Sequence, residues 1–100
     1  MTISNVSIKN GRIEVFDENS KRISYMNLGN KEFICFSDEF FIIIYNSRIE
    51  LYNEKCKRIS YMMKNKREVL SAKGSNFTIK NGNIIEVYDK FCRRISYKPA

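Results

Sequence analysis

Apolar and polar residues alternate with a period of two along most of the chain. Ile13 and Val15 flank Glu14, and Ile23 and Tyr25 again lie two positions apart. Such alternation is typical of β-strands that bury one face. No window of the sequence shows an apolar stripe at helical spacing that is free of competing alternation. The pattern therefore predicts an all-β chain.

One phrase occurs three times at a spacing of 36 residues. Its copies are Lys-Arg-Ile-Ser-Tyr at 21–25 and 57–61 and Arg-Arg-Ile-Ser-Tyr at 93–97. A second phrase, Ile-Glu-Val-Phe-Asp in the first copy, precedes each of them. Self-similarity at a fixed period indicates one supersecondary unit repeated along the chain. We predict a single domain, residues 1–100, made of three antiparallel β-meander repeats at about 5–40, 41–76 and 77–100, the last of them truncated.

Turn residues divide the first repeat into four strands, at about 5–9, 12–17, 21–26 and 32–36. Asn10-Gly11 between the first two strands is a strong hairpin signal. The second turn has three residues if Val15 lies opposite Ile23, and its last position, Ser20, then needs a left-handed conformation. The same register pairs Ile13 with Tyr25 on one face of the sheet, and Glu14 with Ser24 and Phe16 with Arg22 on the other.

The repeat carries an arginine opposite an aromatic residue in each copy. An arginine over an exposed aromatic ring contributes roughly 0.5–1 kcal/mol. In one interpretation these pairs only cover one another on a solvated face. In the other they form a three-fold ring of arginines and aromatics that is open to a ligand. The candidate binding residues are Arg22, Arg58, Arg94, Phe16, Tyr52 and Tyr88, with the neighbouring Lys21, Lys57 and Arg93.

The stretch Asn-Gly-Arg-Ile-Glu-Val-Phe-Asp at 10–17, followed by Lys21, resembles the blade motif of NHL-type β-propellers. It is also similar to short bacterial proteins with Tyr-Asp-x-x-x-Lys-Arg-Ile repeats. The resemblance implies a β-meander unit, and NHL propellers bind RNA or proteins on one face. The chain departs from the motif because Ser20, Cys56 and Cys92 replace the turn glycine, and 36 residues is short for a blade. We therefore carry over the strand pattern and no binding residues.

Three repeats are fewer than the four to eight blades of a typical propeller. We favour closure within one chain, as a pseudo-three-fold β-toroid or barrel, because closure removes sheet edges. The alternative is that the chain forms half of a dimeric six-bladed propeller. Since the third repeat lacks its fourth strand, one edge stays open or a partner fills it.

The segment 40–45 breaks the repeat because it is apolar at consecutive positions. The third repeat has alternating polar residues at the equivalent place, 76–80. A strand that is apolar on both faces is typical of burial on both sides. The other reading of this segment is an interface with a second subunit.

The composition argues against an enzyme. The chain has no histidine and therefore no Ser-His-Asp or Cys-His set. Glu14, Glu50 and Glu86 occupy equivalent repeat positions, which favours salt-bridge partners over acid–base pairs. We expect no catalytic residues and no cofactor.

The cysteines Cys35, Cys56 and Cys92 are odd in number and show no CxxC spacing. Their pattern favours free thiols over disulfides or a metal site. The residues after Met1 do not form a signal-peptide pattern, and there is no apolar run long enough to span a membrane. We therefore expect a cytoplasmic protein without a membrane segment.

The net charge of +7 and the repeated basic and aromatic residues predict a small module that binds nucleic acid or another polyanion. The alternative is a protein-interaction module, an inhibitor or regulator that uses an open sheet edge and the apolar segment 40–45. It could engage a protein partner or form a homodimer. The two functions differ in their dependence on salt, because phosphate binding weakens steeply as salt rises.

Overall fold

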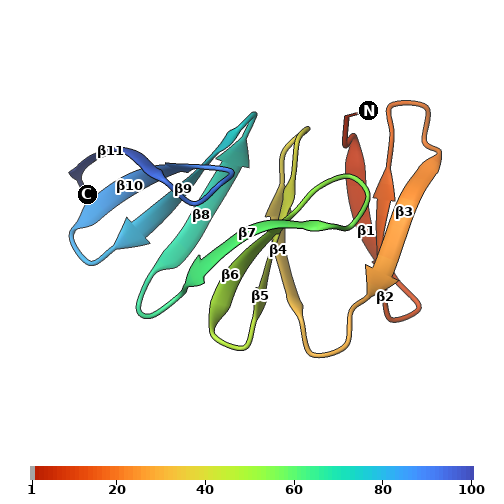
Figure 1. Ribbon diagram of the computed structural model, residues 1–100, viewed down its shortest axis with the longest axis horizontal. Coiled ribbons are helices and arrows are strands. Elements are labelled where there is room, and N and C mark those ends of the chain that lie inside the picture. Colours follow the sequence, from red (N-terminus) through yellow and green to blue (C-terminus); the bar gives the residue numbers. More distant parts are fainter. Residues whose placement is uncertain (1) are drawn as a thin grey trace.

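The computed structural model describes residues 2–100, which form eleven antiparallel strands in three sheets (Figure 1). The first sheet contains β1 (Asn5–Lys9), β2 (Arg12–Phe16) and β3 (Arg22–Asn27). The second contains β4 (Glu32–Phe36), β5 (Phe41–Tyr45), β6 (Arg48–Tyr52) and β7 (Arg58–Met63). The third contains β8 (Glu68–Lys73), β9 (Asn76–Asn81), β10 (Ile84–Asp89) and β11 (Arg94–Pro99). The predicted all-β class is confirmed. None of the described residues belongs to a helix able to cross a membrane.

The β1–β2 hairpin turns at Asn10 and Gly11, as predicted. Their φ angles are 53° and 73°, so both central residues adopt the left-handed conformation that a tight hairpin requires. A side chain helps to form the second turn: the Asp17 carboxylate accepts hydrogen bonds from the backbone N–H groups of Asn19 and Lys21 at 2.9 and 3.0 Å.

The left-handed position predicted at the end of this second turn is confirmed in all three copies. The φ angles are 62° at Ser20, 59° at Cys56 and 63° at Cys92. Asn53 and Asp89 make the same two backbone hydrogen bonds as the first-copy aspartate. A side-chain acceptor at the start of the turn therefore substitutes for the glycine missing at its end.

A β-bulge follows this turn on β3. Phe16 pairs with Arg22 as predicted, but Val15 pairs with Ser24, which leaves Ile23 as an extra residue. The second and third sheets show the same shift. A bulge of this kind places two consecutive side chains on one face of the sheet.

The bulge makes part of the predicted register wrong by one residue. Glu14 lies opposite Tyr25, and Ile13 opposite Met26. The predicted pairs that do not occur are Val15–Ile23, Ile13–Tyr25 and Glu14–Ser24. The alternation of the sequence could not show the extra residue, because the strands on both sides of the bulge keep their period of two.

Sheets and sequence repeats are offset by one strand. The strand at 32–36, the fourth of the first repeat, is β4 and pairs with β5 of the second sheet. The strand at 68–73 likewise begins the third sheet. The third sheet therefore has four strands, and it is the first sheet that has three, with β1 at its edge.

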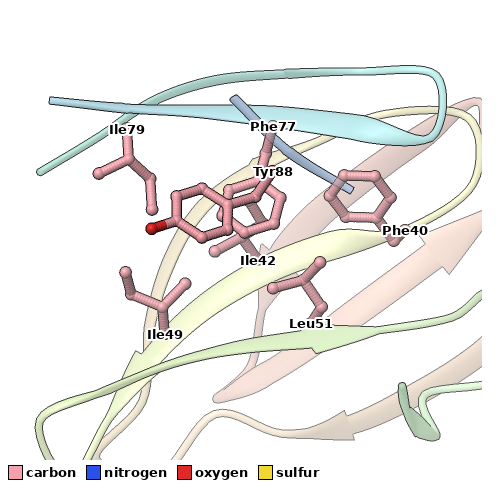
Figure 2. Close-up of a cluster of buried hydrophobic side chains, with 7 residues drawn as sticks. All are labelled: Phe40, Ile42, Ile49, Leu51, Phe77, Ile79 and Tyr88. Atoms are coloured by element: carbon pink, nitrogen blue, oxygen red, sulfur yellow. The ribbon is translucent and has the colours of Figure 1, made fainter. Parts of the chain in front are cut away.

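The three sheets pack face to face and enclose two cores. The first core, between the first and second sheets, contains Ile13 and Val15 from β2 and Phe41 and Ile43 from β5. The second core, shown in Figure 2, joins the second and third sheets through Phe40, Ile42, Ile49, Leu51, Phe77, Ile79 and Tyr88. Segment 40–45 thus sends alternate side chains into both cores, and burial on both sides is confirmed. Because Phe40 through Ile43 are fully buried within the chain, they cannot form the interface considered as the other reading.

The sheets stand in an open row, with principal extents of 40 × 26 × 18 Å (Figure 1). The first strands of the second and third sheets, β4 and β8, lie side by side. The described residues form no closed barrel, so the single-chain toroid is not confirmed.

Candidate functional site

Each sheet buries one glutamate at the same repeat position. Glu14, Glu50 and Glu86 lie on β2, β6 and β10, and their exposed fractions are only 5%, 1% and 2%. A buried carboxylate is costly unless hydrogen bonds and opposite charges stabilise it. We therefore first identify the groups that hydrogen-bond to these glutamates or neutralise their charge.

The repeated arginines supply one partner in every sheet. Arg22 donates to Glu14, Arg58 to Glu50 and Arg94 to Glu86, over 3.0, 3.3 and 3.0 Å. The salt bridges predicted for the equivalent glutamates are thereby confirmed.

A second cation completes each set. Arg12 lies 3.4 Å from Glu14, and Arg48 lies 2.9 Å from Glu50. In the third sheet this position is Ile84, and Arg67 from the β7–β8 loop takes its place at 4.0 Å from Glu86. We call each buried glutamate with its two arginines an Arg–Glu set. Each set carries two positive charges and one negative charge.

The arginines do not stack on the aromatic residues that the sequence predicted. The guanidiniums of Arg22, Arg58 and Arg94 each lie 4.8 Å from the ring centroid of a half-exposed tyrosine, namely Tyr25, Tyr61 and Tyr97. The bulge is the reason, because it places Tyr25 opposite Glu14, so an arginine that reaches the glutamate passes over the tyrosine ring. The three arginines have equivalent surroundings, as the repeat predicts.

The aromatic residues predicted as ligand contacts lie toward the sheet junctions instead. Tyr52 stacks on Phe41 with centroids 5.5 Å apart, and Tyr88 stacks on Phe77 at 5.6 Å. Phe16 lines a hollow on the outer face of the first sheet. The predicted strand pairs Phe16–Arg22, Tyr52–Arg58 and Tyr88–Arg94 do form. Their arginines nevertheless stack on other rings, so the predicted arginine–aromatic contacts do not occur.

The two tyrosine hydroxyls stabilise the buried glutamates. Tyr52 donates to Glu50 over 3.0 Å, and Tyr88 to Glu86 over 3.2 Å. Burial, and secondly the bond to Glu50, raises the pKa of Tyr52 to about 12. Burial opposes the charge of Glu86, but hydrogen bonds from Arg94, Asn81 and Tyr88 outweigh it and hold the pKa of Glu86 below its usual value. The partners of Glu86 therefore favour its charged form, and all three Arg–Glu sets hold neighbouring strands together as structural elements of the fold.

Lys21, Lys57 and Arg93 are exposed on the second-turn loops, as a binding role requires. The Arg93 guanidinium is partly neutralised by Asp89 at 2.8 Å. The end of the molecule that carries these loops also holds six acidic residues, which offset most of its nine basic ones. The acidic residues are Asp17, Glu18, Asp38, Glu39, Glu54 and Asp89.

The opposite end has the larger net positive charge, because it holds as many basic residues but fewer acidic ones. Sequence reasoning did not identify it as one surface. This basic end comprises the five connections β1–β2, β3–β4, β5–β6, β7–β8 and β9–β10, with the two strand residues on either side of each, and residues 98–100. The connections lie along the lower edge of Figure 1. The basic end holds two acidic residues and nine basic ones: Lys9, Arg12, Lys31, Arg48, Lys64, Lys66, Arg67, Lys80 and Lys98.

The two acidic residues of the basic end are exposed and lie at the first positions of β4 and β8, outside the loops. Glu32 and Glu68 line one hollow between β4 and β8, together with Lys64. The five loops themselves contain no acidic residue. Basic residues recur in or beside every other turn of the sequence. Only the strand topology shows that every other turn lies at the same end of the molecule.

The cysteines belong to the contacts between sheets. Cys56 Sγ lies 3.2 Å from Ser24 Oγ, and Cys92 Sγ lies 3.3 Å from Ser60 Oγ. Burial raises the pKa of both thiols. Within residues 2–100, all three cysteines are free, and no cluster of three metal-ligand side chains is present.

Comparisons of the chain with protein-family models, with curated protein sequences and with solved structures found no match.

Proposed function

We propose that the protein is a non-enzymatic module that binds nucleic acid or another polyanion through its basic end. The observation that carries the proposal is the segregation of charge: nine basic and two acidic residues at one end, against nine and six at the other. Clustered lysines and arginines on one surface raise the local potential and attract phosphate groups. This site differs from the doublets that the sequence singled out.

We further propose that the sheets are successive blades of a propeller-like arc. Each is a meander with the same register, β4 and β8 are neighbours as first strands, and corresponding faces pack on one another. In such an arc alternate connections line one face of the ring. This arrangement would present the basic loops as one continuous surface.

The proposed recognition is electrostatic and independent of sequence. Lysines such as Lys9, Lys66 and Lys80 lie exposed at or beside turns, where they can reach phosphates without ordering a rigid pocket. The Arg–Glu sets contribute less, because each guanidinium already serves a buried carboxylate. Their half-exposed tyrosines remain secondary candidates for base stacking.

The first prediction tests the charge and its location together. Binding to a labelled single-stranded and a double-stranded oligonucleotide is measured by fluorescence anisotropy. If five phosphates are contacted, the affinity should fall roughly 500-fold between about 50 and 200 mM salt. The double variant Lys64→Glu/Lys66→Glu, in the β7–β8 loop, should lower the affinity at least about tenfold at the lower salt, because it reverses two charges of the basic end.

The double variant Lys55→Glu/Lys57→Glu is the matched control. It makes the same change in net charge in the loop before β7, whereas Lys64 and Lys66 lie in the loop after it, at the opposite end of the molecule. Equal losses in the two variants would show that net charge and not the basic end governs binding. Absence of binding to either oligonucleotide at low salt would exclude the polyanion function.

A second candidate function, a protein-interaction module, is favoured by one observation. The outward face of the third sheet keeps exposed apolar side chains, including Leu70 and Ile95 at 46% and 55% exposure. The sequence based this function on an open sheet edge and on the apolar segment 40–45. Residues 40–43 of that segment are fully buried and do not support it.

A further inference from the structure

Both junctions between sheets use the same polar contact. Ser24 of the first sheet donates to the Glu54 carbonyl oxygen in a turn of the second sheet, over 2.6 Å. Ser60 of the second sheet donates to the Lys90 carbonyl oxygen in the equivalent turn of the third, also over 2.6 Å. A cysteine of the same turn, 3.2 or 3.3 Å away, adjoins each serine hydroxyl. Each copy of the repeated phrase thus contains both a serine that can donate to the following sheet and a turn whose carbonyl oxygen can accept from the preceding sheet.

At each end of the row of sheets, one group of this contact has no partner sheet within the chain. Ser96 on β11 is the third copy of the junction serine, and it is exposed. The first copy of the receiving turn contains Glu18 and Ser20, which correspond to Glu54 and Cys56 of the second sheet and are also exposed. The chain therefore displays a donor on its last sheet and the corresponding acceptor turn on its first.

The apolar positions of the junction repeat on the last sheet as well. Ile23 and Ile59 pack into the first and second cores, and their third copy is Ile95. Ile34, partly buried in the second core, has Leu70 as its later copy. With the half-buried Ile85 and Val87, these residues give the outward face of the third sheet apolar positions on β8, β10 and β11.

The first sheet offers a matching concavity on its own outward face. A hollow there is lined by Ser4, Asn5, Ser7, Phe16, Asp17 and Ser20. In the second sheet the positions of Asn5, Ser7 and Phe16 are Phe41, Ile43 and Tyr52, which receive the first sheet. The hollow lies where the two internal junctions accept the preceding sheet.

We propose that a second copy of this chain occupies these faces, with the third sheet of each copy packed on the first sheet of the other. Ser96 Oγ would donate to the Glu18 carbonyl oxygen of the second copy, as Ser24 and Ser60 do within the chain. A head-to-tail contact leaves two ends unmatched unless it closes. Two copies would close as a ring of six sheets, within the four to eight blades of known propellers. The inference deepens the protein-interaction candidate and does not depend on polyanion binding.

A disulfide trap tests the contact directly. In the double variant Ser20→Cys/Ser96→Cys, each introduced thiol faces the other across the proposed junction, where a serine and a cysteine adjoin within the chain. We expect mild oxidation to convert the double variant to a covalent dimer on a non-reducing gel. Each single variant, which retains the natural cysteines, should stay monomeric on the gel. The variant Ser60→Cys is the geometric control, because its new thiol should form an intramolecular disulfide with Cys92.

Light scattering of the nucleic-acid-free native chain supplies the second measurement. The expected mass is twice the 11.9 kDa of one chain, and it should persist in high salt because the junction is apolar and hydrogen-bonded. Ile95→Glu should restore the monomer mass. Met63→Glu, also at an exposed apolar residue but outside the proposed junction, should not.

The outcomes separate the parts of the proposal. A monomer mass at the highest soluble concentration, with no disulfide in the double variant, overturns the contact. A ladder of growing oligomers retains the contact but overturns the closed ring. Neither result bears on polyanion binding, which is measured separately and at lower concentration.

Discussion

Strands β5 and β9 occupy the same place in consecutive sheets, yet they differ on one face. Ile43 and Ile79 lie opposite the buried glutamates of their sheets, and both are fully buried. At the preceding position β5 has the fully buried Ile42, whereas β9 has the partly exposed Thr78. The difference follows the neighbours, because the second sheet is covered on both faces and the third on one.

Strand β1 of the first sheet shows the reverse pattern. Val6, at the position of Ile42, is buried against the second sheet, and Ser7, at the position of Ile43, faces outward. A duplicated strand has therefore kept apolar residues on each face that another sheet covers within the chain. The outer faces are more polar but not fully polar, as expected of surfaces that associate reversibly.

The largest effect should come from the face that distinguishes β5 from β9. Ile42→Ala should lower the free energy of unfolding by roughly 2–5 kcal/mol, because it leaves a cavity between two sheets. Thr78→Ala, the matched change in the third sheet, should alter it by at most about 0.5 kcal/mol. Urea unfolding at a concentration that keeps the chain monomeric measures both. Equal losses of unfolding free energy in the two variants would contradict the view that coverage by a neighbouring sheet makes this position important for stability.

A smaller change in stability is expected from the tyrosine hydroxyl that bonds to the buried glutamate in the second sheet but is missing from the first. Tyr52→Phe removes the hydroxyl bonded to Glu50 and should cost about 0.5–1.5 kcal/mol. The first sheet already has Phe16 at this position. Tyr61→Phe is the control, since that residue is half exposed and its ring remains available for stacking with Arg58.

The same tyrosine predicts a dependence on alkaline pH. The pKa of Tyr52 is raised to about 12 in the folded chain, above the value of about 10 for an unfolded tyrosine. Its contribution to the unfolding free energy is fully present below pH 10 or so and is lost as the pH rises toward its folded pKa. Tyr52→Phe should therefore show a shallower alkaline loss than the native chain, and an identical slope would contradict this assignment.

The smallest expected effect is on how the unfolding free energy changes at acidic pH, through Glu86 of the third sheet. Because the folded pKa of Glu86 is lowered, its stabilisation is present above its unfolded pKa of about 4.3 and is lost as the pH falls through the folded value. Glu86→Gln should flatten the decrease in unfolding free energy below about pH 5. Glu68→Gln, at an exposed glutamate of the same sheet, should leave that slope closer to the native one.

Local features of the fold were predictable from the sequence because they depend on residues close together in the chain. The hairpin at Asn10-Gly11 and the left-handed positions Ser20, Cys56 and Cys92 are of this kind. The double burial of segment 40–45 was also predictable, since a strand apolar on both faces has few other stable positions.

The candidate site was only partly predictable. The equivalence of Arg22, Arg58 and Arg94 follows from the repeat, but their stacking partners do not, because the bulge residue shifts Tyr25 opposite Glu14. A one-residue shift changes which side chains meet while leaving the alternation intact. The basic end escaped prediction for a different reason: its lysines are far apart in sequence and share a surface only through the strand topology.

The sequence by itself determined the strands, the turns and the threefold recurrence of the glutamate and of Arg22, Arg58 and Arg94, because each depends on a phrase of fewer than 36 residues that recurs. The second arginine of the third set, Arg67, lies outside the phrase. Only the tertiary structure decided that the strand at 32–36 joins the following sheet, that the sheets stack in an open row, and that the positive charge gathers at one end. Those features depend on which sheets pack against one another, and the apolar pattern of a strand shows that a face is buried but not which sheet covers it.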